Sequence, residues 1–540
     1  MRDKKYTRSI VKGIIQADAR TFFIGIFSTI LTSIIVLSFG GAIRNIVDSG
    51  VGGDGEKLLR GIWFFIGIAV LMCIFAFLRG FCMNVIAEKF CQNLRLNVYA
   101  KILHSKIGAV NSIGRDKILS ILSGDFRQAR TIIGTSFPFL IRSSVTLIGG
   151  LGIIFYISPF LSSVIIGIIA SMMFPLFFFG KKVKKGRVVM QKAIDAYEKR
   201  IFDTVLYLKK IKADISEDLE YSYLQAKNTE IFAMEKRRLV VRSCFISMCI
   251  FIVIIAIAVA MFYGFREVNL GKMSGGDMTA FIIYAVMIAV GLGGVSEHGA
   301  DFANLNKIMR AIYEISDNLM EEKDIIDGKS ADCSKICVSN LEISISAGVI
   351  KIPDFIANAG DVVVFNSKSG SGKSTFFDTL LKFNDAPAGA ISIGDADING
   401  INYREIRAKI TYCLQDSVIL HRTLRENLEC GNSASLDEIK QILVDLGLDY
   451  LITRLEDQVG DFSLSGGEKR RISLASCLLN KASQVIVLDE PTNGLDSSNI
   501  SKIVSVIDTY SRNKILILAS HVPIFQQLLP HRNIIVQDIS

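Results

Sequence analysis

The sequence predicts a multi-domain chain, with an all-α membrane domain followed by an α/β domain. Long uncharged stretches fill the first part, and 50% of all residues are hydrophobic. In the second part, short β-branched runs alternate with amphipathic segments, and a glycine-rich loop follows one of those runs. A mean hydropathy of +0.41 excludes an ordinary soluble protein, and 540 residues leave room for several domains with buried cores.

The first part predicts six membrane spans, because a helix needs about 20 apolar residues to cross a bilayer. The uncharged run from Ser143 to Gly180 is longer than one span and is broken at Ser158-Pro159, so we interpret it as two spans. The shorter second and sixth runs could instead be buried core helices. The predicted spans are about 21–43, 61–80, 137–157, 159–180, 243–265 and 278–296, in a transmembrane domain of residues 21–320.

Lysine and arginine predict the orientation, because cytoplasmic loops carry an excess of them. Both the amphipathic lead-in, residues 1–20, and the connection 181–242 are rich in basic residues. The connection 45–59, by contrast, carries Asp48, Asp54 and Glu56 against Lys57 alone. We therefore expect an integral multi-pass protein of a bacterial inner (plasma) membrane, with both termini in the cytoplasm. Since the net charge of +9 largely reflects these membrane flanks, we expect no nucleic-acid partner.

The cysteines and the domain boundary add little chemistry. The ten cysteines are scattered without a disulfide framework, and Cys333 and Cys337 lack the further ligands of a zinc site. No secretory signal peptide is evident before the first apolar run. A polar linker, residues 321–332, marks the boundary, and the α/β domain is predicted to cover 333–540.

A glycine-rich loop lies between a predicted buried strand, 361–365, and a predicted helix, 373–383. A helix N-terminus after such a loop presents backbone N–H groups and a positive dipole end to phosphates. We expect Lys373 to reach the β- and γ-phosphates and the Ser374 hydroxyl to bind Mg²⁺. The position six residues before the lysine, usually glycine, is Ser367, which could strain the loop. The predicted phosphate-binding residues are Ser369, Gly370, Ser371, Gly372, Lys373, Ser374 and Thr375.

A second apolar strand, 485–488, ends in the acidic pair Asp489-Glu490. A carboxylate at a strand end suits Mg²⁺, usually through water, so Asp489 is a candidate metal ligand. Glu490 is placed to act as a general base on an attacking water. Acidic pairs after strands are common, so a structural role is the alternative.

These motifs, in their order along the chain, resemble the nucleotide-binding domain of an ABC transporter, an α/β P-loop ATPase with a helical subdomain. The six-span half resembles the membrane domain of the exporter type, so the resemblance covers essentially the whole chain. Its most specific part is the signature Leu464–Glu468. The matching residues are those of the phosphate loop, Gln415, the signature, Asp489, Glu490, Asp496 and His521.

The resemblance implies further roles for single residues. Gln415 would contact Mg²⁺ and the water, and His521 would contact the γ-phosphate. The signature residues Ser465, Gly466 and Gly467 would close over the ATP of the opposite subunit, and Asp496 would lie in a loop crossing that interface. Short coupling helices are implied near 107–113 and 201–208. The expected catalytic residues are then Glu490, His521, Gln415 and Lys373, and the expected metal ligands are Ser374, Gln415 and Asp489.

The resemblance also implies ATP-driven transport by two chains, because one phosphate loop and one signature face different nucleotides. A homodimer is the simplest assembly, and pairing with a related half-transporter is the alternative. Because Ile, Phe, Leu and Met dominate the spans, we expect export of a lipid or a drug-like hydrophobic molecule from among the membrane lipids. Glu297, His298 and Asp301 are candidate substrate contacts, or a solvated cluster at the cytoplasmic edge.

Two departures from the family pattern favour a competing hypothesis, that the chain is a catalytically weakened or regulatory half-transporter. One is Ser367, and the other is the absence of an aromatic residue from 338–350, where a ring would stack on adenine. Stacking contributes roughly 1–3 kcal/mol per base, so its absence predicts weaker ATP binding.

Overall fold

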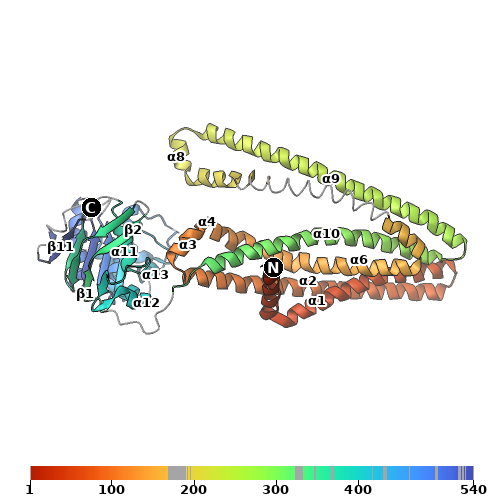
Figure 1. Ribbon diagram of the computed structural model, residues 1–540, viewed down its shortest axis with the longest axis horizontal. Helices are drawn as coiled ribbons and strands as arrows, with labels where there is room; N and C mark the ends of the chain where they lie inside the picture. The colour runs from red at the N-terminus through yellow and green to blue at the C-terminus, as the bar shows by residue number, and fades with distance from the viewer. Residues whose placement is uncertain are drawn as a thin grey trace. The chain divides into compact units, whose positions relative to one another are not determined.

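The computed structural model shows two compact units, residues 1–100 with 115–317, and residues 101–114 with 318–540. Each is described by itself, with the elements labelled in Figure 1. The structure describes residues 2–167, 190, 193–194, 196–322, 332–345, 348–366, 370–415, 417–429, 434–460, 462–492, 497–520, 525, 528–529 and 531–538.

In the first unit, every element among the described residues is a helix, as predicted. Its elements are α1 (Arg2–Val51), α2 (Gly55–Leu103), α4 (Arg115–Ser120), α5 (Phe126–Thr131), α6 (Phe137–Ile157), α8 (Leu208–Ala213), α9 (Glu217–Asn269) and α10 (Gly275–Asn318), with π-helical turns at Ile121–Asp125 and Ile132–Ser136. Among the described residues, four segments are long and apolar enough to cross a membrane, 12–51, 55–103, 117–157 and 275–318. The predicted span 243–265 lies within α9, and most of 159–180 lies outside the described residues.

The lead-in and the first span form one helix, α1, with a break at Asp18 (φ −168°, ψ 90°). The Asp18 carboxylate accepts hydrogen bonds from the Thr21 backbone N–H (3.1 Å) and hydroxyl (2.9 Å), and it pairs with Lys89 Nζ at 2.5 Å. Asp18 thus caps the second part of α1 as a carboxylate, which favours the positive end of a helix dipole.

Small residues bring α6 close to α10, which lies alongside it in Figure 1. A Cβ added to Gly150 would lie 2.9 Å from Cγ1 of Ile288, and one added to Gly294 would lie 2.3 Å from Oγ of Ser143. Close backbone approach through glycine is the usual way for membrane helices to gain packing energy without a hydrophobic driving force. Larger residues at these two positions would push the helices apart.

The second unit is built on a five-stranded parallel sheet in the order β11-β5-β10-β9-β8. Alternate residues of its strands enter two separate cores, so Val363 and Val487 pack on one side and Val364 and Leu488 on the other. Burial on both faces explains the uninterrupted apolar runs of these strands in the sequence. The strands are β5 (Val362–Phe365), β8 (Ile410–Cys413), β9 (Val485–Asp489), β10 (Ile515–Ala519) and β11 (Ile534–Gln537).

Further sheets and helices complete this unit. An antiparallel sheet has the order β4-β1-β6-β7, from β1 (Lys335–Val338), β4 (Phe355–Asn358), β6 (Ile391–Ile393) and β7 (Ala396–Asp397), and β2 (Leu341–Ile345) pairs with β3 (Gly348–Ile352). The helices are α11 (Lys373–Leu380), α12 (Tyr403–Lys409), α13 (Leu424–Glu429), α14 (Leu436–Asp445), α15 (Gly466–Leu478) and α16 (Ser497–Ser511), with 3₁₀ turns at Ile398–Gly400 and Asp449–Arg454. The predicted fold class, a helical membrane domain followed by an α/β ATPase domain, is confirmed.

One of the two short helices implied by the resemblance needs correction. The helix α3 (Ile107–Ile113) stands at its implied position and belongs to the second unit. The other short helix is not at 201–208: the preceding helix continues to Leu206, and α8 begins only at Leu208. Tyr207 separates them because its backbone (φ −104°, ψ 21°) leaves the helical region.

Candidate nucleotide site

The phosphate loop joins β5 to α11, as the strand, loop and helix pattern predicts. Gly370 (φ +85°) and Gly372 (φ +88°) have left-handed backbones, which glycine adopts without strain. Gly372 is also the N-cap of α11, so Lys373 begins that helix. Ser371 and Thr375 are half-buried beside it, and Ser369 and Ser367 lie outside the described residues.

The two glycines predict a graded pair of stability effects. Alanine at either position should cost about 1–2 kcal/mol, because both backbones are left-handed. Gly372→Ala should cost about 1 kcal/mol more, since its Cβ would lie 2.7 Å from Cδ1 of Ile350, whereas nothing lies within 4 Å of a Cβ at Gly370. Unfolding of the nucleotide-free chain by denaturant measures the loss of stability in both variants. Equal losses would contradict the close approach of Ile350.

Asp489 is the buried carboxylate of the site and is 4% exposed. The Ser374 hydroxyl donates to its Oδ2 at 2.8 Å, and the Tyr412 hydroxyl donates to the same oxygen at 3.3 Å. Burial raises the pKa of Asp489, and these two donors oppose that rise by stabilising the charged form. The strand end of β9 and the first turn of α11 therefore meet at this carboxylate.

Lys373 lies close to both acidic residues. Its side chain is buried, and burial lowers the pKa of its ammonium, while the charges of Glu490 and Asp489 raise it. A cation between two carboxylates and a glycine-rich loop suits the binding of a polyphosphate. The structure thus brings Lys373, Ser374, Asp489 and Glu490 together as the sequence predicts.

Glu490 is held in an unusual backbone conformation. Its φ of +51° is rare for a residue with a side chain, and its N–H donates to the Ala519 carbonyl of the neighbouring strand at 3.1 Å. Gln415 Nε2 donates to Glu490 Oε2 at 3.0 Å, which leaves the amide oxygen of Gln415 for another partner. Strain of this kind persists where the surrounding structure fixes a side chain for function.

Two residues of the site were not predicted from the sequence. Tyr412 reaches Asp489 because β8 pairs with β9, and Arg470 Nη2 donates to the backbone carbonyl of Gln415 at 3.2 Å. Tyr412 stands three residues before Gln415, and that proximity was the available signal. Arg470 stands two residues after the signature Leu464–Glu468, but nothing in the sequence links it to Gln415, which lies 55 residues earlier in the chain.

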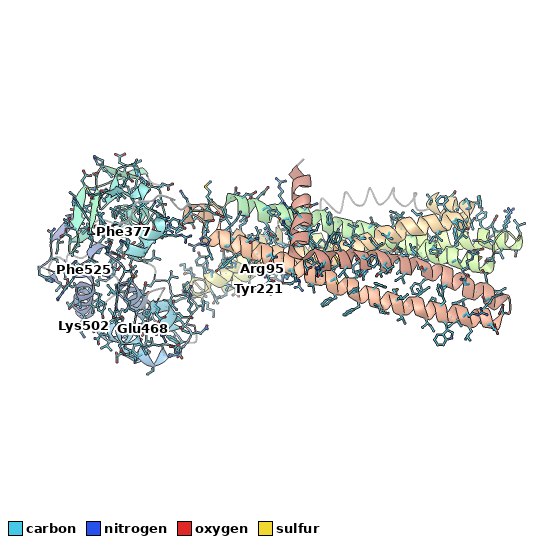
Figure 2. The ribbon with its side chains drawn as sticks, turned by 90° about the horizontal axis from the view of Figure 1, so that it is seen from below. Arg95, Tyr221, Phe377, Glu468, Lys502 and Phe525 are labelled. Atoms are coloured by element: carbon cyan, nitrogen blue, oxygen red, sulfur yellow. The ribbon has the colours of Figure 1, made fainter. Side chains whose placement is uncertain are left out.

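The signature forms a separate cluster at the start of α15. Ser465 is its N-cap, with Oγ accepting from the Glu468 N–H at 3.3 Å and the Glu468 carboxylate accepting from the Ser465 N–H at 2.6 Å. The Tyr450 hydroxyl also donates to Glu468. A Cβ on Gly466 or Gly467 would meet nothing within 4 Å. Figure 2 shows Glu468 in a different part of this unit from Phe377 of α11.

Asp496 and His521 lie outside the described residues. Within the described part of the chain, no group of three or more His, Cys, Asp or Glu could hold a metal ion. The hydroxyl of Ser374 beside the carboxylate of Asp489 does fit Mg²⁺, which prefers oxygen ligands and takes few of them from the protein.

Comparisons with known proteins agree with this architecture. Residues 22–291 match the family described as ABC transporter transmembrane region, and residues 350–493 match the family described as ABC transporter. An export ATP-binding/permease protein of Rickettsia conorii is 28% identical over 533 residues, covering 96% of this chain and 90% of the relative. A multidrug resistance ABC transporter ATP-binding and permease protein of Lactococcus lactis is 24% identical over 538 residues, covering 96% and 89%.

The same fold is found in a solved structure. A bacterial Atm1-family ABC exporter with ATP bound superposes with a TM-score of 0.79 at 19% identity, covering 97% of this chain and 94% of the other. A membrane region and an ATP-binding domain thus share one polypeptide in exporter order. The chain belongs to the ABC transporters, and it is a membrane-embedded transport ATPase of the exporter type.

Proposed function

We propose that the chain exports or flips an amphiphilic substrate, lipid or drug-like, across a bacterial inner membrane as an ATP-hydrolysing homodimer with cytoplasmic termini. The observation that carries the proposal is the arrangement of Gln415 and Glu490, which share a 3.0 Å hydrogen bond beside the bond from the Ser374 hydroxyl to the buried Asp489. A general base held by a neighbouring amide is an arrangement that a hydrolysing site needs and a binding module does not.

In the proposed reaction the loop 369–375 and Lys373 bind the phosphates of ATP. Glu490 accepts a proton from the attacking water, which Gln415 helps to orient, while His521 contacts the γ-phosphate. Ser374, Gln415 and Asp489 would hold Mg²⁺, which neutralises charge on the β- and γ-phosphates when bound. Asp489 is itself almost fully shielded from solvent.

A dimer is supported by the separation of the signature from its own phosphate loop. Ser465, Gly466 and Gly467 then complete the nucleotide site of a partner chain, next to the loop that carries Asp496. The Ser465 hydroxyl, which accepts a bond from the Glu468 N–H at 3.3 Å, lies at the start of α15, where a helix N-terminus favours a phosphate. ATP held between two chains stabilises the closed dimer and shifts the membrane domains with it.

The proposed substrate class is supported by a cluster of side chains on α2, α6 and α10. The Arg79 guanidinium lies 4.9 Å from the centre of the Phe139 ring. That ring stacks on the His298 ring, with 5.4 Å between the two ring centres. Within the described part of the chain, Arg79 Nη1 and His298 Nδ1 are buried without a hydrogen-bond partner. Arg142, one helical turn after Phe139, is near enough to Arg79 for their charges to repel.

This cluster, Arg79 with Phe139, Arg142 and His298, favours an anionic head group. Uncompensated cations at the ends of apolar spans are costly, and an anionic amphiphile would offset that cost while its chains lie against the spans. His298, a candidate from the sequence, therefore belongs to the proposed substrate site. Asp301 accepts a bond from Ser136 at 2.8 Å and lies 3.8 Å from His298, so it orients the cluster.

Transport of a labelled lipid tests this function. We expect proteoliposomes to translocate nitrobenzoxadiazole-labelled phosphatidylglycerol in an ATP-dependent way, measured by dithionite quenching. Arg79→Gln should lower that rate roughly tenfold, as expected for the loss of a charged hydrogen bond, and should spare the matched zwitterionic phosphatidylcholine. The control Arg60→Gln changes an arginine that pairs with Glu56 on the protein surface. Equal effects of Arg79→Gln on both lipids would contradict an anionic substrate.

A second candidate function is a weakened half that needs a competent partner. The side chain over the phosphate loop is the aliphatic Ile350 of β3, close to Gly372, which agrees with the lack of a stacking aromatic in 338–350. Weak adenine binding would favour this alternative. The two candidates differ in one result, namely whether the purified chain alone hydrolyses ATP.

A further inference from the structure

Arg407 of α12 makes a concentrated set of contacts that the nucleotide chemistry does not use. Its guanidinium pairs with Glu322 through two parallel bonds, Nη1 to Oε2 at 2.7 Å and Nη2 to Oε1 at 2.8 Å. The Glu322 side chain is only 11% exposed. The rings of Phe383 and Tyr403 lie 4.5 Å and 4.8 Å from the same guanidinium. A bidentate, partly buried pair fixes geometry far better than an exposed ion pair.

Arg407 also binds the end of the helix that follows the phosphate loop. Its Nε donates to the Leu381 carbonyl at 3.0 Å and its Nη2 donates to the Lys382 carbonyl at 3.1 Å. Leu381 is the C-cap of α11, and the first residue of α11 is Lys373. A helix this short moves as a rigid rod, so a shift at its phosphate end is carried to Leu381.

Glu322, the partner of Arg407, lies in a backbone crossing of two chain segments. Its N–H donates to the His104 carbonyl at 2.8 Å, the Lys106 N–H donates to the Met320 carbonyl at 2.9 Å, and Ser105 pairs with Glu321 as an antiparallel bridge. One segment continues α2 into α3, and the other leaves α10. Lys106 Nζ reaches Asp385 at 3.0 Å, so the crossing is also tied to the loop after α11.

We propose that Arg407 and Glu322 are positioning residues that couple ATP binding to the membrane helices. Together with the carbonyls of Leu381 and Lys382 they form the Arg407 clasp, which joins α11 to the crossing of residues 104–106 with 320–322. Binding of nucleotide at Lys373 then changes the preferred position of α3. Because the chain is continuous, the ends of α2 and α10 shift with it. The inference rests on the proposed ATP-driven function and names the residues through which it acts.

Hydrogen–deuterium exchange of the full chain in nanodiscs tests the clasp. In a Glu490→Gln background, which holds ATP unhydrolysed, we expect added ATP and Mg²⁺ to slow exchange both at 370–381 and at 104–113. Arg407→Lys, which keeps the charge but not the bidentate geometry, and Glu322→Gln should keep the response at 370–381. Both should reduce the response at 104–113 by roughly three- to thirtyfold, the range of a coupling residue.

A matched control and a double variant separate coupling from folding. Glu321→Gln removes the neighbouring carboxylate, which is exposed, and should leave both responses unchanged. The double variant Arg407→Lys with Glu322→Gln should reduce the response at 104–113 no more than either single variant, because both changes break the same contact. A misfolded variant would lose the response at 370–381, so its retention shows that the variant is folded.

Two results would overturn the inference, and they are distinguishable. If 104–113 still responds fully to ATP in Arg407→Lys and Glu322→Gln, the clasp does not couple the site to α3, although ATP binding stands. If ATP fails to protect 370–381 even in the Glu490→Gln parent, the proposed function fails, and the coupling fails with it.

Discussion

Replacing Glu490 by Gln should reduce ATP hydrolysis by the purified chain in nanodiscs by about 10²–10⁴-fold, the range for loss of a general base. The amide has nearly the same shape as the carboxylate and can still hydrogen-bond to Gln415, so ATP binding should persist. The strained backbone of Glu490, with φ +51° and its N–H bonded to Ala519, should hold the amide in the same place. The loss should therefore appear in kcat rather than in nucleotide affinity.

Lys373→Ala should also abolish hydrolysis, for a different reason. Lys373 is buried beside Asp489 and Glu490, and its removal leaves phosphates and carboxylates facing one another without a cation. Here nucleotide affinity should fall together with turnover. As a control, Glu456→Gln removes an exposed carboxylate that pairs with Arg425, and it should leave hydrolysis unchanged.

The opposite outcome has a definite meaning. If the unmodified chain binds ATP but hydrolyses it no faster than Glu490→Gln, the homodimeric pump is excluded. The weakened half suggested by Ser367 and Ile350 would then stand, and a partner chain would have to supply the competent site.

Gly466→Ala should separate stability from activity at the signature. Nothing lies within 4 Å of a Cβ built on Gly466, and alanine is a better helix former than glycine, so unfolding stability should stay the same or rise by up to about 1 kcal/mol. Hydrolysis should nevertheless fall at least roughly tenfold, as when a well-placed phosphate contact is lost. Loss of activity without loss of stability would indicate that this glycine allows close approach of another molecule, which we propose is the ATP of a partner chain.

Thermal unfolding and ATP turnover of the same preparation check this prediction. Gly400→Ala is the matched control, because a Cβ there also meets nothing within 4 Å, and it should change neither property appreciably. Full activity of Gly466→Ala would show that no nucleotide approaches the start of α15 closely, and the head-to-tail dimer would lose its main support.

Local parts of the nucleotide site could be predicted from sequence because their chemistry is contiguous. The strand β5, the glycine loop and α11 follow one another, and Gly370 and Gly372 stand where the backbone turns left-handed. The apolar strand before Asp489 is parallel to β5, with β10 between the two, so both strands end at the same edge of the sheet. The Lys373, Ser374 and Asp489 cluster was predictable on this basis.

Other parts needed more than one local pattern. The positions of Gln415, Asp496 and His521 came from a family resemblance, and the structure describes only the first of these three. The second short helix was placed too early because nothing in residues 201–213 marks Tyr207 as a break. Its backbone leaves the helical region between two segments that are both helical.

The sequence by itself determined the membrane domain and the ATPase domain, and it predicted which residues bind phosphate, because periodicity and motifs are local properties. Only the tertiary structure decided that Tyr412 and Arg470 support the site, that Arg79 stacks on Phe139, and that Arg407 joins Glu322 to the end of α11. These contacts join residues from separate elements, so their geometry depends on how strands and helices pack. No local sequence pattern encodes that packing.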